Sequence, residues 1–103
     1  ADPYYNRGLA RNDLGDHRGA IDDFSTAIQL KPDHTLVYYD RALSRLALGD
    51  RAGAIADFGQ SAKLCLDQGR TTCYKDAQFQ LKKLQSSGEV PTKGTGAAET
   101  APQ

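Results

Sequence analysis

The sequence is poor in the residue types on which several classes of protein depend. Its 103 residues include no methionine, no tryptophan, two cysteines and two histidines. Its net charge is zero, and its 13 basic residues are interspersed with 13 acidic ones rather than gathered in a run. No apolar segment approaches the ~20 residues that a membrane-spanning helix needs. We therefore expect a single soluble domain, with no nucleic-acid partner and no direct membrane insertion.

Residues that carry catalysis or ligate metals are equally sparse. His17 and His34 fall in turns that we predict at opposite ends of helices about 20 Å long, which argues against a shared metal site. Ser25, Ser44 and Ser61 have no histidine within reach by spacing, and the chain contains no glycine-rich phosphate loop. We therefore expect no enzyme activity, no metal and no cofactor.

What the sequence does contain is a repeat. Fifteen residues recur unchanged 34 positions later. The identical pairs are Tyr4/Tyr38, Tyr5/Tyr39, Arg7/Arg41, Leu9/Leu43, Arg11/Arg45, Leu14/Leu48, Gly15/Gly49, Asp16/Asp50, Gly19/Gly53, Ala20/Ala54, Ile21/Ile55, Asp23/Asp57, Phe24/Phe58, Leu30/Leu64 and Asp33/Asp67. A period of this length, with two helical segments per unit, is typical of an array in which each unit buries its apolar face on the next.

A Leu-Gly-Asp sequence divides each unit into two helices. Gly15 and Gly49 suit the left-handed conformation that ends a helix, and Asp16 and Asp50 suit the N-cap of the next one. Asp33 is the expected N-cap of the third helix. The predicted helices span residues 2–14, 18–30, 35–48 and 52–67.

The small and aromatic residues of the repeat carry a family resemblance. They are Tyr4, Gly8, Ala20, Phe24, Ala27 and Pro32 in the first unit, and Tyr38, Ala42, Ala54 and Phe58 in the second. In this spacing the chain resembles the tetratricopeptide repeat (TPR) family. The resemblance implies an all-α fold, a right-handed superhelical array of antiparallel helix pairs (an α-α solenoid) with five helices.

Charged residues depart from the family pattern. Arginines stand where the family often has leucine and tyrosine, at Arg7, Arg11, Arg41 and Arg45. We expect their aliphatic stems to pack and their charged heads to be solvated. We interpret Asp22, Asp23 and Asp57 as charges near the start of the second helices that complement the helix dipole.

The last third of the chain divides into a helix and a tail. An apolar stripe of Tyr74, Ala77, Leu81 and Leu84 predicts an amphipathic capping helix. Phe79 lies across that helix, where it either packs on the preceding helix or stays exposed. The predicted organisation is a TPR domain over 1–87, with repeats at about 1–34 and 35–68, a capping helix at about 71–86, and a disordered tail or linker over 88–103.

Cys65 and Cys73 bracket the short loop before the capping helix. A loop of that length allows a disulfide, and two reduced cysteines packed between helices are the alternative. The compartment is not indicated by the sequence, although a disulfide favours an exported protein.

In the TPR family, the first helices of successive units line a concave groove that binds peptides or helices. Carried over to this chain, the lining positions are Tyr5, Leu9, Asn12, Tyr39, Leu43 and Leu46, and Tyr74 continues them if one residue is inserted. Asp40 has the wrong charge for a clamp on a chaperone's terminal carboxylate, so an apolar or aromatic segment is the expected ligand. The tyrosines either bind this ligand or pack against each other or the capping helix.

The resemblance therefore implies a non-catalytic protein–protein interaction scaffold, such as an adaptor or assembly factor, that holds a peptide or helix of a partner protein in the groove. The alternative is a structural or self-associating fragment of a longer TPR array, a homo-oligomer whose groove is filled by a neighbouring chain. The chain starts without an initiator methionine, which we interpret as a trimmed longer protein or a removed leader.

Overall fold

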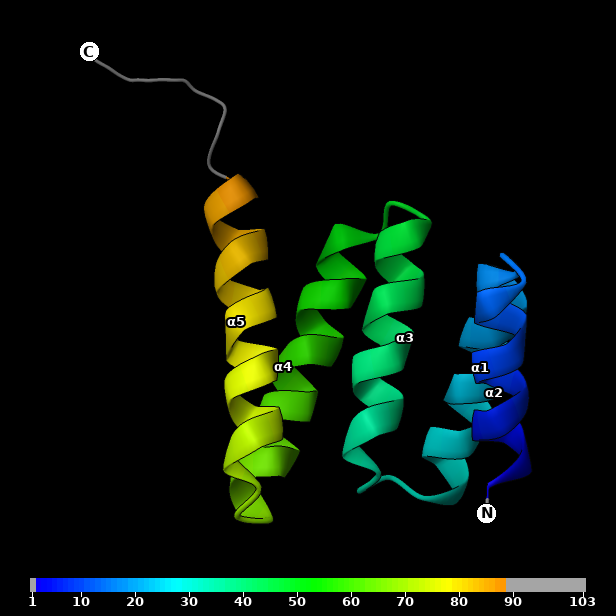
Figure 1. Cartoon of the computed structure of the whole chain (residues 1–103), viewed down its shortest axis with the longest axis horizontal. Helices are drawn as coiled ribbons and strands as arrows, with labels where there is room; N and C mark the ends of the chain where they lie inside the picture. Colours follow the sequence, from blue (N-terminus) through cyan, green and yellow to red (C-terminus); the bar gives the residue numbers. More distant parts are fainter. Residues whose placement is uncertain (1, 89–103) are drawn as a thin grey trace.

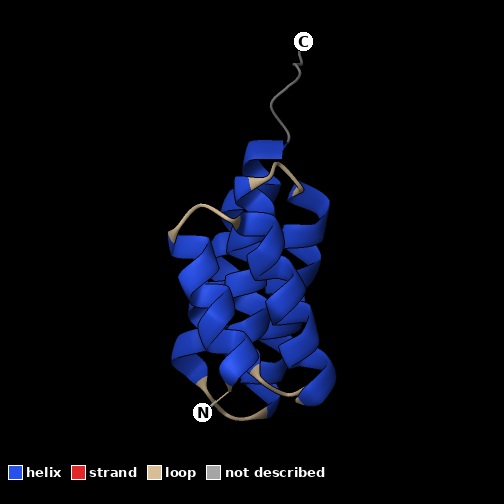
Figure 2. Cartoon of the chain, turned by 90° about the vertical axis from the view of Figure 1, so that its right-hand side faces the viewer, coloured by secondary structure: helices blue, strands red, loops and turns tan. Residues whose placement is uncertain are grey.

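Five helices follow one another in the computed structural model, which describes residues 2–88. They are α1 (Pro3–Asp13), α2 (His17–Leu30), α3 (Thr35–Ala47), α4 (Arg51–Asp67) and α5 (Thr71–Gly88). Neighbouring helices run antiparallel and pack in chain order, from α1 on one side to α5 on the other (Figure 1). Seen from the side, the loops gather at the two ends of the helices (Figure 2). The prediction of an all-α solenoid of helix pairs with five helices is confirmed.

The turns inside both helix pairs form as their residues predict. Gly15 and Gly49 have φ angles of 85° and 83°, in the left-handed region that glycine enters without strain. Asp16 then accepts a hydrogen bond from the amide of Gly19 at 3.0 Å. In the second pair, Asp50 accepts the equivalent bond at 2.9 Å. These caps satisfy amides that would otherwise have no partner at the helix N-terminus.

The predicted N-cap of the third helix is wrong. The cap of α3 is His34, and its side chain makes no capping hydrogen bond. Asp33 lies one residue earlier, and its carbonyl oxygen instead accepts from the side-chain amide of Gln68 at 2.9 Å. The loop before α3 is thereby tied to the end of α4.

Two buried phenylalanines organise the core. Phe24 and Phe58 are both fully buried, one in each helix pair. A Cβ atom added to Gly8 would lie 2.6 Å from Phe24 Cε1, so the ring occupies the space that a side chain would take. Ala42 holds the equivalent place above Phe58 and is also fully buried. Close helix packing therefore depends on the small residues of the repeat.

A buried carboxylate joins α1 to α2. Asp23 is 3% exposed, and Arg7 binds it through two hydrogen bonds, from Nε at 2.9 Å and from Nη2 at 2.8 Å. Arg11 adds an ion pair at 3.3 Å. Arg7 lowers the pKa of Asp23 from its ordinary value, because the guanidinium hydrogen bonds favour the charged form.

The second helix pair repeats this arrangement. Arg41 binds Asp57 through bonds of 2.9 and 2.7 Å and also donates to Ser25 of α2 at 3.1 Å. Arg45 adds a bond of 2.9 Å to the same carboxylate. The predicted role of Asp23 and Asp57 is therefore corrected: they are buried in the middle of α2 and α4, where they pair with the arginines, whereas Asp22 is exposed. Only 16% of the Arg41 side chain is exposed, because α2 and α4 both pack around it.

The last helix covers the second pair with one side only. Ala77 of α5 is fully buried, and Leu81 and Leu84 pack against the cluster that includes Phe58. Phe79 is 64% exposed and lies outside this cluster. Among the five helices described, none is long and apolar enough to cross a bilayer. The tail predicted from residue 88 onward lies, apart from Gly88 at the end of α5, outside the described residues.

Candidate functional site

Seven of the eight predicted groove residues lie on α1 and α3. We define the α1/α3 surface by these side chains, which are Tyr5, Leu9, Asn12, Tyr39, Asp40, Leu43 and Leu46. Two hydrogen bonds join the helices there. The hydroxyl of Tyr5 donates to Asp40 Oδ2 at 2.6 Å, and the hydroxyl of Ser44 donates to Asn12 Oδ1 at 3.0 Å. These two bonds add polar links between the helix pairs, whose main contact is between α2 and α3.

Both tyrosine rings of this surface pack within the protein. The ring of Tyr5 lies 5.9 Å from that of Phe24 and 5.0 Å from the imidazole of His34, measured between centroids. Tyr39 packs edge-on against Phe58 at 5.1 Å. Its hydroxyl accepts from Gln80 of α5 at 3.3 Å. These contacts fix the rings, so a partner would meet a rigid surface that needs little ordering.

The bond between Tyr5 and Asp40 lies in a partly buried environment. Burial raises the pKa of Tyr5, and the hydrogen bond to Asp40 adds to the shift. Burial also raises the pKa of Asp40, while the Tyr5 hydrogen bond and the charge of His34 act in the opposite direction. The carboxylate is thus a partly desolvated acceptor, which strengthens its bonds to donors.

Leu43 supplies an exposed apolar side chain next to this acceptor. It is 37% exposed and follows Asp40 by three residues on the same helix, which places the two on one side of α3. Leu9 and Leu46 are partly buried, and each packs against the core cluster of its own helix pair. A contact surface for an apolar residue therefore lies beside a hydrogen-bond acceptor.

Tyr74 is the one predicted groove residue on α5. Its hydroxyl accepts from Gln78 at 2.8 Å, within α5. It borders a shallow hollow on α5 with Lys75, Gln78, Phe79, Lys82 and Gln85, and this hollow contains no residue of α1 or α3.

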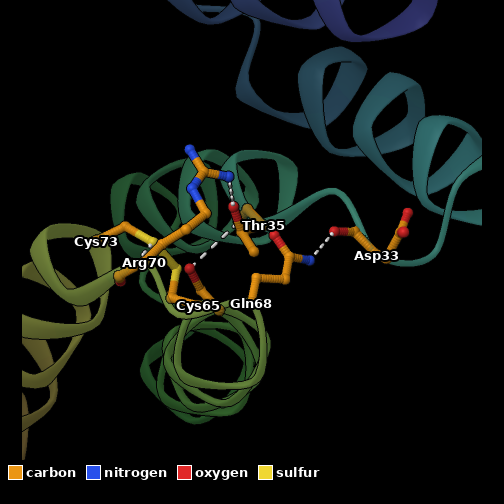
Figure 3. The surroundings of a disulfide bond; sticks show 7 residues. Asp33, Thr35, Cys65, Gln68, Arg70 and Cys73 are labelled. Carbon is orange, nitrogen blue, oxygen red and sulfur yellow. Dashed lines mark hydrogen bonds between the residues drawn. A yellow bond between two sulfur atoms is a disulfide. The ribbon is translucent and has the colours of Figure 1, made fainter.

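The two cysteines are joined by a disulfide in the structure. Cys65 in α4 is fully buried, and Cys73 lies in the first turn of α5 (Figure 3). Between them, Arg70 donates to the hydroxyl of Thr35 at 3.2 Å, at the start of α3. The disulfide and this bond together fix the loop that leads into α5.

Two residues of this site escaped the sequence reasoning. Ser44 stands where the first unit has Ala10, so the repeat gives no signal for its bond to Asn12. Gln80 lies on α5, beyond the two repeats.

The two histidines lie next to residues of the α1/α3 surface: His17 contacts Asn12 and His34 contacts Tyr5. Within residues 2–88 no cluster of three histidine, cysteine or acidic side chains is arranged to hold a metal.

A family comparison matches the first part of the chain. The tetratricopeptide repeat family matches residues 1–34, the segment that forms α1, α2 and the loop after them. No curated protein matches the chain. The match to the first helix pair, together with five helices that pack in chain order, fits a repeat protein of the TPR type.

Proposed function

We propose that this chain, which fits a TPR-type repeat protein, is a non-catalytic scaffold whose α1/α3 surface binds a peptide or helix of a partner protein. The TPR family as a whole suggests a protein–protein interaction scaffold. Binding at the α1/α3 surface is supported by a single observation: the exposed Leu43 lies beside the partly buried acceptor Asp40.

The surface favours a ligand with one apolar side chain and a nearby donor. The apolar side chain would remove Leu43 from water, at roughly 25 cal/mol per Å² of buried apolar area. A backbone amide or a basic group of the ligand would reach the Asp40 carboxylate, whose desolvation makes a charge-assisted bond strong. A ligand that ends in a carboxylate at this place is disfavoured by repulsion from Asp40.

A matched pair of leucine variants tests this proposal. Leu43→Asp puts a charge on the α1/α3 surface, while Leu66→Asp makes the same change at a leucine of α4 that is 57% exposed. Peptides are first selected from a displayed library on the unmodified protein, and their affinities are then measured by fluorescence anisotropy. We expect Leu43→Asp to weaken binding at least about tenfold, or ~1.4 kcal/mol, and Leu66→Asp to change it less than about twofold.

Circular dichroism of each variant checks that helix content is unchanged. Equal losses of affinity for both variants, or none for Leu43→Asp, would refute the α1/α3 surface as the binding site. Tyr39→Ala is less suited to this test, because its ring packs on Phe58 and its loss would also destabilise the fold. Asp40→Asn complements the pair, since it keeps an acceptor for Tyr5 and removes only the charge.

A second candidate function, self-association with neighbouring chains, is supported by the open side of α1. In the second unit, Ser44 is fully buried and Asp40 is partly buried where α3 meets α1. Their counterparts in the first unit, Ala10 and Asn6, are exposed. Sedimentation velocity over a wide range of concentrations separates the two functions: a monomer at all concentrations that binds its peptide one to one contradicts self-association.

A further inference from the structure

The side of α5 that faces away from α4 is the most distinctive surface outside the site just described. Within the described residues, α3 lies between α2 and α4, whereas α5 packs chiefly on α4. One side of α5 is buried through Ala77, Leu81 and Leu84. We define the α5 outer face by the residues of the hollow on its other side, which are Tyr74, Lys75, Gln78, Phe79, Lys82 and Gln85.

This face combines aromatic rings with positive charge. Phe79 is 64% exposed, and Tyr74 borders the same hollow. Lys75 and Lys82 follow each other after two helical turns and so lie on the same side of α5. The one acidic residue described on α5, Asp76, does not border the hollow. The α5 outer face therefore offers apolar contact together with unbalanced positive charge.

The residues of the α5 outer face form a row along the helix, as residues that receive a second helix do. On α3, Tyr39, Ala42 and Leu46 pack with Phe58 of α4. These three positions lie three and four residues apart, as on any helix face that receives another helix. Tyr74, Gln78 and Lys82 on α5 lie four residues apart, with Phe79 beside them. This row is more polar than the one on α3, since Gln78 and Lys82 stand beside the two aromatic rings.

We propose that the α5 outer face is a second binding surface, distinct from the α1/α3 surface, for an acidic amphipathic helix of a partner protein. Apolar side chains of that helix contact Phe79 and Tyr74, and its carboxylates pair with Lys75 and Lys82. The face extends from Tyr74 to Gln85, so the partner helix needs about 12 residues, or ~18 Å.

Charge selects this occupant over a second copy of the same face. Two α5 outer faces packed on each other would oppose lysine to lysine, and like charges at an interface cost binding energy. An acidic helix removes that repulsion. An acidic helix should also associate faster at low salt, because opposite charges attract the two surfaces as they approach.

Two designed helical peptides test the proposal. They share one apolar stripe, and one carries glutamates and the other lysines beside it. Each is titrated into the 103-residue chain with its disulfide intact, both unmodified and as Leu43→Asp, and binding is followed by fluorescence anisotropy at low and at physiological salt. The two peptides are compared in Leu43→Asp, because a basic apolar helix also suits the α1/α3 surface. We expect the acidic peptide to bind at least tenfold more tightly than the basic one, and its affinity to fall as salt rises.

Variants test whether the acidic peptide binds at the α5 outer face. Phe79→Ser and Lys82→Glu are each expected to weaken the acidic peptide at least tenfold. Lys63→Glu, an equal charge change at an exposed lysine of α4, is expected to leave it within about twofold. Leu43→Asp is likewise expected to have no effect. Because Lys82→Glu removes the net positive charge of the face, it should also improve binding of the basic peptide, which a merely unfolded variant would not do.

Several results would overturn the proposal. They are equal affinity for the two peptides, no effect of Phe79→Ser, and loss of acidic-peptide binding in Leu43→Asp, which would assign that peptide to the α1/α3 surface. Self-association abolished by Lys82→Glu would make a second copy the occupant. Competition by a synthetic peptide of residues 89–103 would make that segment of the chain the occupant. Because the proposed function is tested with a different peptide and with the pair Leu43→Asp and Leu66→Asp, either proposal can fail while the other stands.

Discussion

Gly8 has no side chain at the point where α1 lies on the ring of Phe24. Gly8→Ala would place a methyl group 2.6 Å from that ring, which is fully buried and has no room to move. Overpacking of this kind costs about 1–3 kcal/mol, more than the ~1 kcal/mol that alanine gains over glycine inside a helix. We expect a net loss in the free energy of unfolding, measured by urea denaturation.

Gly59 of α4 provides the matched control. A Cβ atom at this helical glycine would meet nothing within 4 Å, so Gly59→Ala gains helix propensity without a clash. We expect it to raise the free energy of unfolding by up to ~1 kcal/mol. If both substitutions changed stability in the same direction, the packing account of Gly8 would be wrong.

The ion pair of Asp23 predicts how stability responds to acid. Hydrogen bonds from Arg7 lower the pKa of Asp23 in the folded protein, so between the folded and unfolded pKa values the unfolded chain binds more protons. The contribution of this group is therefore present above its ordinary pKa and is lost as the pH falls through the lowered one. We expect Asp23→Asn to unfold at lower urea concentration near neutral pH, and the difference from the unmodified protein to shrink in acid.

Urea midpoints measured between pH 6 and pH 2 test this expectation. A difference that stays constant over this range would show that the charge of Asp23 contributes no stability.

Asp57→Asn provides a comparison from the second helix pair. We expect it to cost about 3 kcal/mol, because it leaves Arg41 with its side chain 16% exposed and without its carboxylate. The cost of Asp23→Asn should be smaller, since 56% of the Arg7 side chain is exposed to water.

These residues also show where reading the sequence succeeds and where it does not. Gly15 and Asp16 carry their conformational preferences with them, so the turn could be predicted from residue types alone. The partnership of Asp23 with Arg7 could not, because it depends on how α1 and α2 are rotated against each other. A signal was present nonetheless: an arginine is followed by an aspartate 16 residues later in both units, at Arg7/Asp23 and Arg41/Asp57.

At the level of elements, α5 is supported chiefly by α4. Its apolar contacts come from one side, through Ala77, Leu81 and Leu84, and the disulfide between Cys65 and Cys73 fixes its first turn to α4. By the loop-entropy relation, a bond that closes so short a loop contributes on the order of 2 kcal/mol. Reduction should therefore loosen α5 first and leave the first helix pair intact.

Hydrogen–deuterium exchange with and without a dithiol reductant measures this. We expect the amides of α5 to exchange faster after reduction, and those of α1 and α2 to be unchanged. Cys73→Ser in the absence of reductant should reproduce the effect, which separates the disulfide from other actions of the reductant. Equal protection of α5 in both states would show that its apolar side alone holds it in place.

The elements were more predictable than their ends and neighbours. Apolar periodicity placed all five helices within a few residues, since burial requires that pattern whatever the tertiary contacts. The predicted cap of α3 is one residue too early: the cap is His34, whose side chain makes no capping bond, so no cap preference marks its position. The carbonyl of Asp33 instead accepts from Gln68. A bond between segments 35 residues apart leaves no local pattern to read.

At the level of the whole molecule, the repeat determines which residues share a surface but not what covers them. The 34-residue period placed Tyr5 and Tyr39 at equivalent positions, and the structure finds both on the α1/α3 surface, each packed on the phenylalanine of its own helix pair. Whether a ring packs internally or stays free depends on the neighbouring helix. The period ends before Tyr74, which explains why its extension to α5 rests on an assumed insertion.

The central claim is that the α1/α3 surface holds a partner segment. The most direct test is a titration of the isotope-labelled protein with its selected peptide, followed by NMR spectra of the amide and methyl groups. The account predicts that signals of Leu9, Asn12 and Leu43 shift in proportion to binding, while those at the middle of α2 and α4 stay in place. Shifts confined to α2 and α4, with the methyl groups of Leu43 unmoved at saturation, would contradict it.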